Sequence, residues 1–249
     1  VGTNNHGNRR LHRSCYRPDP QAHTSRGVDA VTAIGGVADG LAQAEAELGL
    51  TSGIIVCVLR DQPVEDAHRM LDQALATGTP LLGIGLDSAE VGHPPGQFAA
   101  VFEAAREAGL HTVAHAGEEG PAAYIWEALD VLGAERIDHG VRCLDDPALV
   151  ARLVADRIPL TVCPLSNLRL KVVLDLAAHP LKRMLDAGLL VTINSDDPAY
   201  FGGYAGDNVT RTQRALGLTD DELRTLAANS IDASFAPPER KAQLRLALG

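Results

Sequence analysis

The sequence has 249 residues, 45% of them hydrophobic and 22% charged, a composition typical of a globular protein in water. Its 22 basic and 32 acidic residues give a formal net charge of −10, which argues against a nucleic-acid-binding surface. No apolar stretch reaches the roughly 18 residues of a membrane-spanning helix and no signal-peptide pattern is found, so we expect neither membrane insertion nor export.

The four cysteines show no pairing pattern. Cys15, Cys57, Cys143 and Cys163 form no CxxC motif and no compact framework. This spacing favours reduced thiols and a cytoplasmic protein. Cys57 and Cys163 lie inside apolar runs, so we expect them in the core.

Apolar, β-branched runs alternate with amphipathic stretches along the chain. The predicted strands are Gly53–Leu59, Leu81–Leu86, Thr112–Ala116, Arg136–His139, Ile158–Cys163 and Leu189–Asn194. The predicted helices are Val64–Ala76, Gly96–Glu107, Pro121–Leu132, Pro147–Ala155 and His179–Ala187. Such alternation predicts an α/β fold with a parallel sheet buried on both faces. A (β/α)8 TIM barrel is the first choice and an open doubly wound sheet the second.

The first 18 residues differ from the rest of the chain. They are polar and basic, show no alternation and do not begin with Met, so they predict no strand. A barrel needs two strands before Gly53. We therefore expect residues 19–249 to form an N-terminally truncated barrel domain that lacks the first strand or strands. We expect residues 1–18 to be a segment from outside the family or one translated in a wrong reading frame.

Three apolar runs end in chemistry-bearing side chains. His115 and His139 lie at the ends of two of these runs. Asp196 follows the third run, and Asp197 is its neighbour. In a barrel of parallel strands, side chains at the strand C-termini converge on one mouth. Two imidazoles and a carboxylate there would suit a divalent metal that activates water.

At these residues the chain resembles the metal-dependent adenosine/adenine deaminases of the amidohydrolase superfamily. The motifs that carry the resemblance are HAGEEGP (residues 115–121), RIDHG (136–140), CPLSN (163–167) and NSDDPAYFGG (194–203). DPQAHTSRG (19–27) is similar to the adenine-specific members of bacteria and fungi. The resemblance implies a (β/α)8 barrel with one zinc per subunit. It further implies hydrolysis of adenine to hypoxanthine and ammonia in purine salvage.

The resemblance also implies roles for individual residues. His115 and Asp196 match metal ligands of the family, and Glu118 matches the acid that protonates the purine ring nitrogen. His139 matches the histidine that orients and helps deprotonate the attacking water. Asp197 matches the residue that hydrogen-bonds the imidazole nitrogen of the purine. The alternatives from general protein chemistry are a core histidine at 115, a helix cap at 196 and a first-turn glutamate at 118.

Other matches are looser. Ser88 and Glu90 fall where the family contacts the other edge of the purine. Asp138 would either help to read a base that lacks ribose or bond to His139. His23 and Arg26 would join the substrate pocket. We interpret Ser166 and Asn167 as loop-shaping residues and Tyr200 and Phe201 as pocket walls, and we expect surface or capping positions for the remaining histidines, His68, His93, His111 and His179.

One family feature is absent from the sequence. Members of the family carry a His-x-His motif that supplies two zinc ligands, and this sequence contains none; His6 and His12 are too far apart to match it. Two alternatives therefore stand beside adenine deamination: adenosine deamination by the same residues, and a remnant without catalytic activity. We expect low or no activity from this chain. The partner is a small purine rather than nucleic acid or a membrane, and a monomer and a homo-oligomer are both compatible with the sequence.

Overall fold

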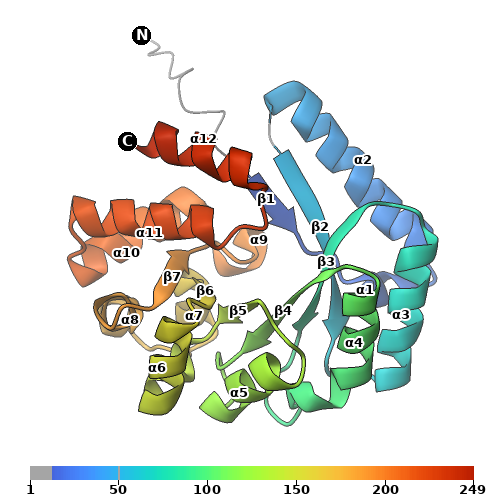
Figure 1. Ribbon diagram of the computed structural model, residues 1–249, viewed down its shortest axis with the longest axis horizontal. Coiled ribbons are helices and arrows are strands. Elements are labelled where there is room, and N and C mark those ends of the chain that lie inside the picture. Colours follow the sequence, from blue (N-terminus) through green and yellow to red (C-terminus); the bar gives the residue numbers. More distant parts are fainter. Residues whose placement is uncertain (1–12, 50) are drawn as a thin grey trace. The chain divides into compact units, whose positions relative to one another are not determined.

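The structure, a computed structural model, describes residues 13–49 and 51–249 (Figure 1). The chain divides into two compact units. Of the described residues, the first unit comprises those up to residue 89 and residues 97–112, and the second comprises residues 90–96 and 113–249.

The first unit contains parallel strands in chain order. The strands are β1 (Arg13–Tyr16), β2 (Thr51–Leu59) and β3 (Leu81–Asp87), and the helices are α1 (Pro20–Thr24), α2 (Ala30–Leu48), α3 (Val64–Ala76) and α4 (Ala99–Glu107). β2 pairs with β1 on one side and with β3 on the other. Its residues from Ile54 to Val58 are all buried, which is the pattern of a strand covered on both faces.

Strand β1 corrects the expectation that the first 18 residues form no strand. It pairs in parallel with β2, with Arg13 opposite Thr51 and Tyr16 opposite Ile54. The pairing is made by backbone groups, so a short strand forms beside a longer neighbour without an alternating side-chain pattern. Residues 1–12, with His6 and His12, lie outside the described part. The domain boundary at residue 18 stays a prediction.

The second unit repeats the strand–helix alternation. Its strands are β4 (His111–Ala116, which begins in the first unit), β5 (Arg136–His139), β6 (Pro159–Val162) and β7 (Leu190–Ile193). Its helices are α5 (Ala122–Asp130), α6 (Pro147–Ala155), α7 (Pro164–Arg169), α8 (Leu181–Asp186), α9 (Pro198–Phe201), α10 (Ala205–Leu216), α11 (Asp220–Asp232) and α12 (Pro238–Leu248). Three 3-10 turns, η1 (Pro95–Phe98), η2 (Val141–Asp145) and η3 (Leu176–Ala178), complete the described elements. All three strand pairs from β4 to β7 are parallel.

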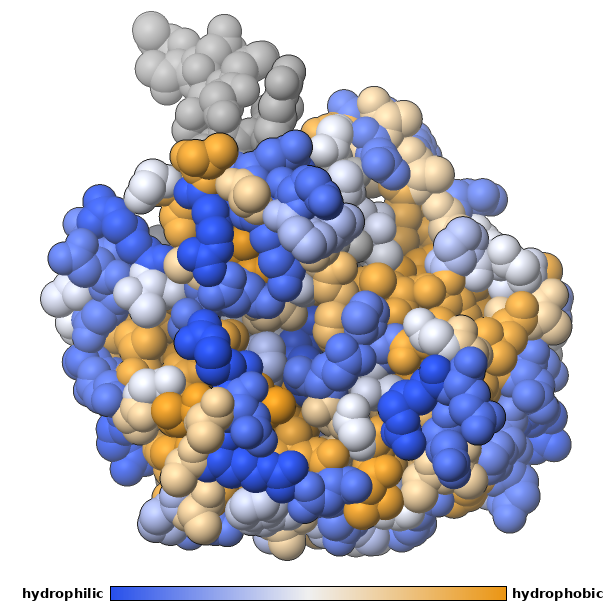
Figure 2. All heavy atoms as spheres, in the orientation of Figure 1, coloured by the Kyte–Doolittle hydropathy of each residue, from blue (hydrophilic) through white to orange (hydrophobic). Residues whose placement is uncertain are grey.

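Local sequence signals explain where several helices begin. Asp146 caps α6 by accepting the backbone N–H groups of Ala148 and Leu149, and Pro147 occupies the first turn. Thr219 and Glu222 form a reciprocal capping box at α11. The surface over α10 and α11 is largely hydrophilic (Figure 2), as expected for helices that bury only one face.

The predicted elements are recovered, most of them within two residues. β5, α3 and α6 match their predicted ranges residue for residue. The predicted helix from Gly96 to Glu107 is divided into a 3-10 turn and α4. No helix in the described ranges is both long and apolar enough to cross a membrane.

Candidate active site

Three predicted site residues lie at strand ends of the second unit. His115 is near the end of β4, His139 is the last residue of β5, and Asp196 follows β7. The register places His115 beside Asp138 and Ala116 beside His139. Because these strands are parallel, their C-terminal ends share one edge, where His139 lies next to both His115 and Asp196.

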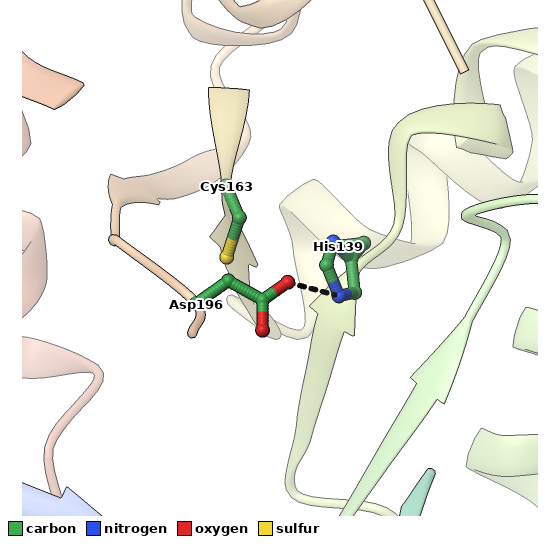
Figure 3. A group of neighbouring side chains, drawn as sticks. All are labelled: His139, Cys163 and Asp196. Atoms are coloured by element: carbon green, nitrogen blue, oxygen red, sulfur yellow. Dashed lines mark ion pairs between the residues drawn. The ribbon is translucent and has the colours of Figure 1, made fainter. Parts of the chain in front are cut away.

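His139, Cys163 and Asp196 form a compact group (Figure 3). Their nitrogen, sulfur and oxygen donors all lie within 4.8 Å of one another. Nε2 of His139 is 3.8 Å from Oδ2 of Asp196. The expectation that Cys163 is buried is confirmed, since only 6% of it is exposed. Its thiol nevertheless faces the polar group rather than an apolar core.

The backbone at this group is unusual. His139 has a φ of 63° and Asp196 a φ of 56°, in the left-handed region that residues with a Cβ rarely adopt. Such a conformation costs on the order of 1–2 kcal/mol per residue. Strain of this kind concentrates at functional sites, where it aims a side chain in a direction that the regular strand would not give.

His115 lies against His139 and Asp138. The two imidazole rings have centroids 4.9 Å apart with a tilt of 49°. Nδ1 of His115 is 3.7 Å from Oδ2 of Asp138, which is only 2% exposed. Asp138 also contacts Thr161 and Arg136. A carboxylate behind a histidine is the arrangement that orients metal-binding imidazoles. The purine-reading role predicted for Asp138 stays a prediction.

Glu118 enters the same group from the turn after β4. Its Oε1 lies 3.1 Å from Nδ1 of His139, and its side chain is 12% exposed. Burial raises the pKa of this carboxyl, while the neighbouring imidazole of His139 opposes the rise and the carboxylate of Asp196 adds to it. A buried glutamic acid with a raised pKa can hold a proton near neutral pH and donate it.

Glu90 contacts the backbone of the turn that follows β4. Its carboxylate accepts four consecutive backbone N–H groups: Gly117 at 2.5 Å, Glu118 at 3.0 Å, Glu119 at 2.8 Å and Gly120 at 2.9 Å. Glu90 is 3% exposed, so its charge is stabilised by these dipoles rather than by water. The structure thus shows Glu90 holding the loop that presents Glu118. A purine contact by Glu90 stays a prediction.

Asn167 and His179 are site residues that the sequence pattern missed. Asn167 is fully buried on α7, and its Nδ2 donates to Oε1 of Glu118 at 2.7 Å. His179, expected at the surface or as a cap, is 3% exposed; its Nδ1 accepts the N–H of Leu181, the first residue of α8, and its Nε2 lies 3.1 Å from Oδ1 of Asn167. Burial lowers the pKa of His179 to about 4. The usable signal was the CPLSN motif itself, which places an amide in the short helix that follows β6.

The remaining predicted residues are more exposed. Asp197 is exposed, and its backbone N–H donates to Oδ1 of Asp196 at 3.0 Å. Ser88 is exposed in the first unit with a φ of 71°. Tyr200 is 78% exposed, so in this structure it does not wall an enclosed pocket. His23 and Arg26 are exposed near α1. The substrate roles of these residues stay predictions.

The donors at the strand ends fit zinc. Zinc in proteins binds imidazole nitrogen, thiolate sulfur and carboxylate oxygen. His139, Cys163 and Asp196 offer one of each, and His115 adds a second imidazole next to His139. The donor chemistry therefore suits the metal that the strand-end pattern predicts.

A second group of donors lies in the first unit. Asp19, Cys57 and Asp87 also have their donor atoms within 4.8 Å of one another. Burial raises the pKa of Asp87 well above its usual value, and the neighbouring Asp19 raises it further. Two carboxyls this close favour sharing one proton over holding two charges.

The sequence and structure were compared with known proteins. The profile of the adenosine deaminase family matches residues 13–248. The chain is 57% identical over 227 residues to an adenine deaminase of Streptomyces coelicolor, covering 91% of this chain and 67% of the relative. It is 57% identical over 225 residues to an adenine deaminase of Cupriavidus necator, covering 90% of this chain and 64% of the relative. The chain thus spans about two thirds of the length of these relatives.

Solved structures show the same likeness. The crystal structure of an adenine deaminase from Arthrobacter aurescens matches with a TM-score of 0.93 and 55% identity, over 95% of this chain and 72% of the other. A zinc-containing amidohydrolase from Burkholderia ambifaria matches with a TM-score of 0.89 and 28% identity, over 95% and 66% of the two chains. With the parallel strand–helix alternation, these matches confirm the predicted α/β barrel class.

Glu90→Gln should destabilise the protein by roughly 2–3 kcal/mol. The amide replaces one acceptor oxygen by a donor, which leaves at least one buried N–H of the loop from Gly117 to Gly120 without a partner. Urea denaturation gives the free energy of unfolding. Glu119→Gln is the matched control because it removes the same charge from an exposed side chain of that loop. Equal stability of the two variants would contradict the role given to Glu90.

His179 should make stability depend on pH. Its pKa is about 4 in the folded protein and near 6.5 when unfolded. Between these values the unfolded chain binds more protons, so stability rises with pH from 4 to 6.5 and is lost as pH falls through that window. The loss should amount to about 3 kcal/mol. The free energies of unfolding of wild type and His179→Asn, plotted against pH, should approach one another as pH falls from 6.5 to 4. A constant difference between the two plots would show that His179 titrates normally.

Proposed function

This chain belongs to the adenosine deaminase family, and we propose that its activity is the zinc-dependent hydrolytic deamination of adenine to hypoxanthine and ammonia. The observation that carries the proposal is the contact between Glu118 and His139, a raised-pKa carboxyl 3.1 Å from an imidazole and next to Asp196. The identity to relatives named adenine deaminases supports adenine as the substrate. In metabolism, this reaction would belong to purine salvage.

Removal of an aromatic amine by water makes three demands. Water must become nucleophilic, the ring nitrogen next to the attacked carbon must gain a proton, and the amine must leave as ammonia. Zinc, when bound, supplies the Lewis-acid chemistry that meets the first demand near neutral pH. His115 and Asp196 are the residues proposed to hold it, with one zinc per subunit, and Cys163 lies near Asp196.

Glu118 is the proposed acid for the second demand. Burial raises its pKa and so favours the protonated carboxyl, and protonation of the ring nitrogen makes the adjacent carbon a better electrophile. A positioned acid of this kind contributes about 10²–10⁴-fold in rate. The backbone N–H groups of Glu118 and Glu119 donate to the carboxylate of Glu90, which limits the directions in which the Glu118 side chain can point.

His139 and Asp197 serve the attacking water and the substrate. Nε2 of His139 points to the Asp196 side, where the water would be oriented and would lose its proton. The left-handed backbone at His139 aims the ring there. Asp197 is proposed to accept a hydrogen bond from the imidazole part of the purine, as its position next to Asp196 allows. A cytoplasmic location and a small-purine partner belong to the same proposal.

Glu118→Gln should slow deamination strongly without unfolding the protein. Glutamine preserves the acceptor toward Asn167 but has no acidic proton, so kcat should fall by about 10²–10⁴-fold. Release of ammonia from adenine, measured at saturating substrate, gives kcat, and circular dichroism checks the fold. Glu119→Gln, which alters the exposed neighbour, should retain wild-type kcat. Comparable rates for Glu118→Gln and wild type would exclude Glu118 as the acid.

The zinc content of the protein and its turnover rate should rise together as zinc is added. Because the sequence holds no His-x-His, we expect weak zinc binding, and slow loss of the 6-amino group of adenine that requires added zinc. The measurement is metal content by elemental analysis, with ammonia release from adenine and from adenosine in parallel. A higher kcat/KM for adenosine would favour the adenosine alternative. Stoichiometric zinc without turnover of either substrate would favour the inactive alternative.

A further inference from the structure

A chain of buried polar groups leads to Glu118, and none of its members is a proposed catalytic or zinc-binding residue. Asn167 is fully buried and His179 is 3% exposed. Their side chains connect the backbone at the start of α8 to the carboxyl of Glu118. Buried polar groups are costly unless each finds a partner, so the directions of these hydrogen bonds can be worked out in turn.

The direction is set at the α8 end. The backbone N–H of Leu181 donates to Nδ1 of His179 at 3.1 Å. A backbone N–H is always a donor, so Nδ1 must present a lone pair. A neutral imidazole with an acceptor at Nδ1 carries its proton on Nε2. Burial supports the neutral form, because it lowers the pKa of His179 to about 4.

The proton on His179 in turn orients Asn167. Nε2 of His179 lies 3.1 Å from Oδ1 of Asn167 and donates to it. The amide oxygen is thereby fixed toward His179, and the amide nitrogen points the other way. Nδ2 then donates to Oε1 of Glu118 at 2.7 Å and lies 3.3 Å from Nδ1 of His139.

The backbone holds Asn167 firmly in this place. Its N–H donates to the carbonyl of Cys163 at 2.9 Å, and its carbonyl accepts the N–H of Val173 at 3.2 Å. Pro164 in the first turn of α7 restricts the chain just before it. Asn167 can therefore transmit the orientation of His179 without moving itself.

We propose that Asn167 and His179 are positioning residues for the deamination reaction. They form a one-way hydrogen-bond chain from Leu181 N–H to Glu118, which makes Oε1 of Glu118 an acceptor and leaves Oε2 to carry the acidic proton. This inference rests on the proposed function for its catalytic meaning. The hydrogen-bond chain itself rests only on the contacts.

The first part of the test is spectroscopic and needs no activity. In two-bond 15N–1H spectra of the zinc-free chain, the ring of His179 should show a protonated Nε2 and an unprotonated Nδ1 from pH 6 to 8, where its pKa of about 4 keeps it neutral. The side-chain amide signal of Asn167 should shift in Glu118→Gln and stay unchanged in Glu119→Gln. A proton on Nδ1 of His179, or an Asn167 amide signal that is the same in wild type and Glu118→Gln, would overturn the proposed hydrogen-bond chain.

The second part is kinetic and uses isosteric variants. Asn167→Asp can still accept from His179 but cannot donate to Glu118, so kcat should fall on the order of 10- to 100-fold while KM changes little. Asn229→Asp makes the same change in an amide that donates to the carbonyl of Val191, and it should preserve kcat. Unchanged kcat in Asn167→Asp would refute the positioning role.

Two substitutions at His179 separate orientation from folding. In His179→Gln the amide nitrogen can replace Nε2 as the donor to Asn167, so kcat should be largely retained. In His179→Asn the side chain can accept from Leu181 but ends short of Asn167, so kcat should fall as in Asn167→Asp. Equal loss in both would indicate a merely structural role. Absence of turnover in wild type would overturn the proposed function alone, and the spectra would then decide the hydrogen-bond chain.

Discussion

The carboxylate of Glu90 is the interaction on which the arrangement of the site depends. It gathers four consecutive backbone N–H groups, from Gly117 to Gly120, around a single buried charge. Desolvating a carboxylate is costly, and only such a set of aligned donors offsets that cost in an interior position. The turn that follows β4 is held by this cradle, and the turn carries Glu118. Glu90 thereby helps to fix the backbone from which the buried side chain of Glu118 extends.

The fold supplies the second constraint, which is where the strands end. β4, β5 and the segment after β7 deliver His115, His139 and Asp196 to a common edge because parallel strands end on the same side. His139 and Asp196 also have a left-handed backbone, at an energetic cost that the surrounding hydrogen bonds and packing must offset.

The elements differed in how far local sequence predicted them. The ranges of α3, α6 and β5 followed from periodicity and from capping or breaking residues at their ends. The convergence of His115, His139 and Asp196 followed from the strand-end rule. β1 was missed because its pairing is made by the backbone. The contacts of Glu90 with the N–H groups of residues 117–120 were not predicted, because backbone N–H groups carry no side-chain signature.

Sequence by itself determined the class of the fold, the family and the residue types available for the chemistry, because these depend on periodicity and on motifs read along one chain. Only the tertiary structure decided what each side chain faces. The hydrogen-bond chain from Leu181 through His179 and Asn167 to Glu118 joins residues up to 63 positions apart, as counted along the sequence. Burial and hydrogen-bond direction arise from such contacts, and no local pattern contains them.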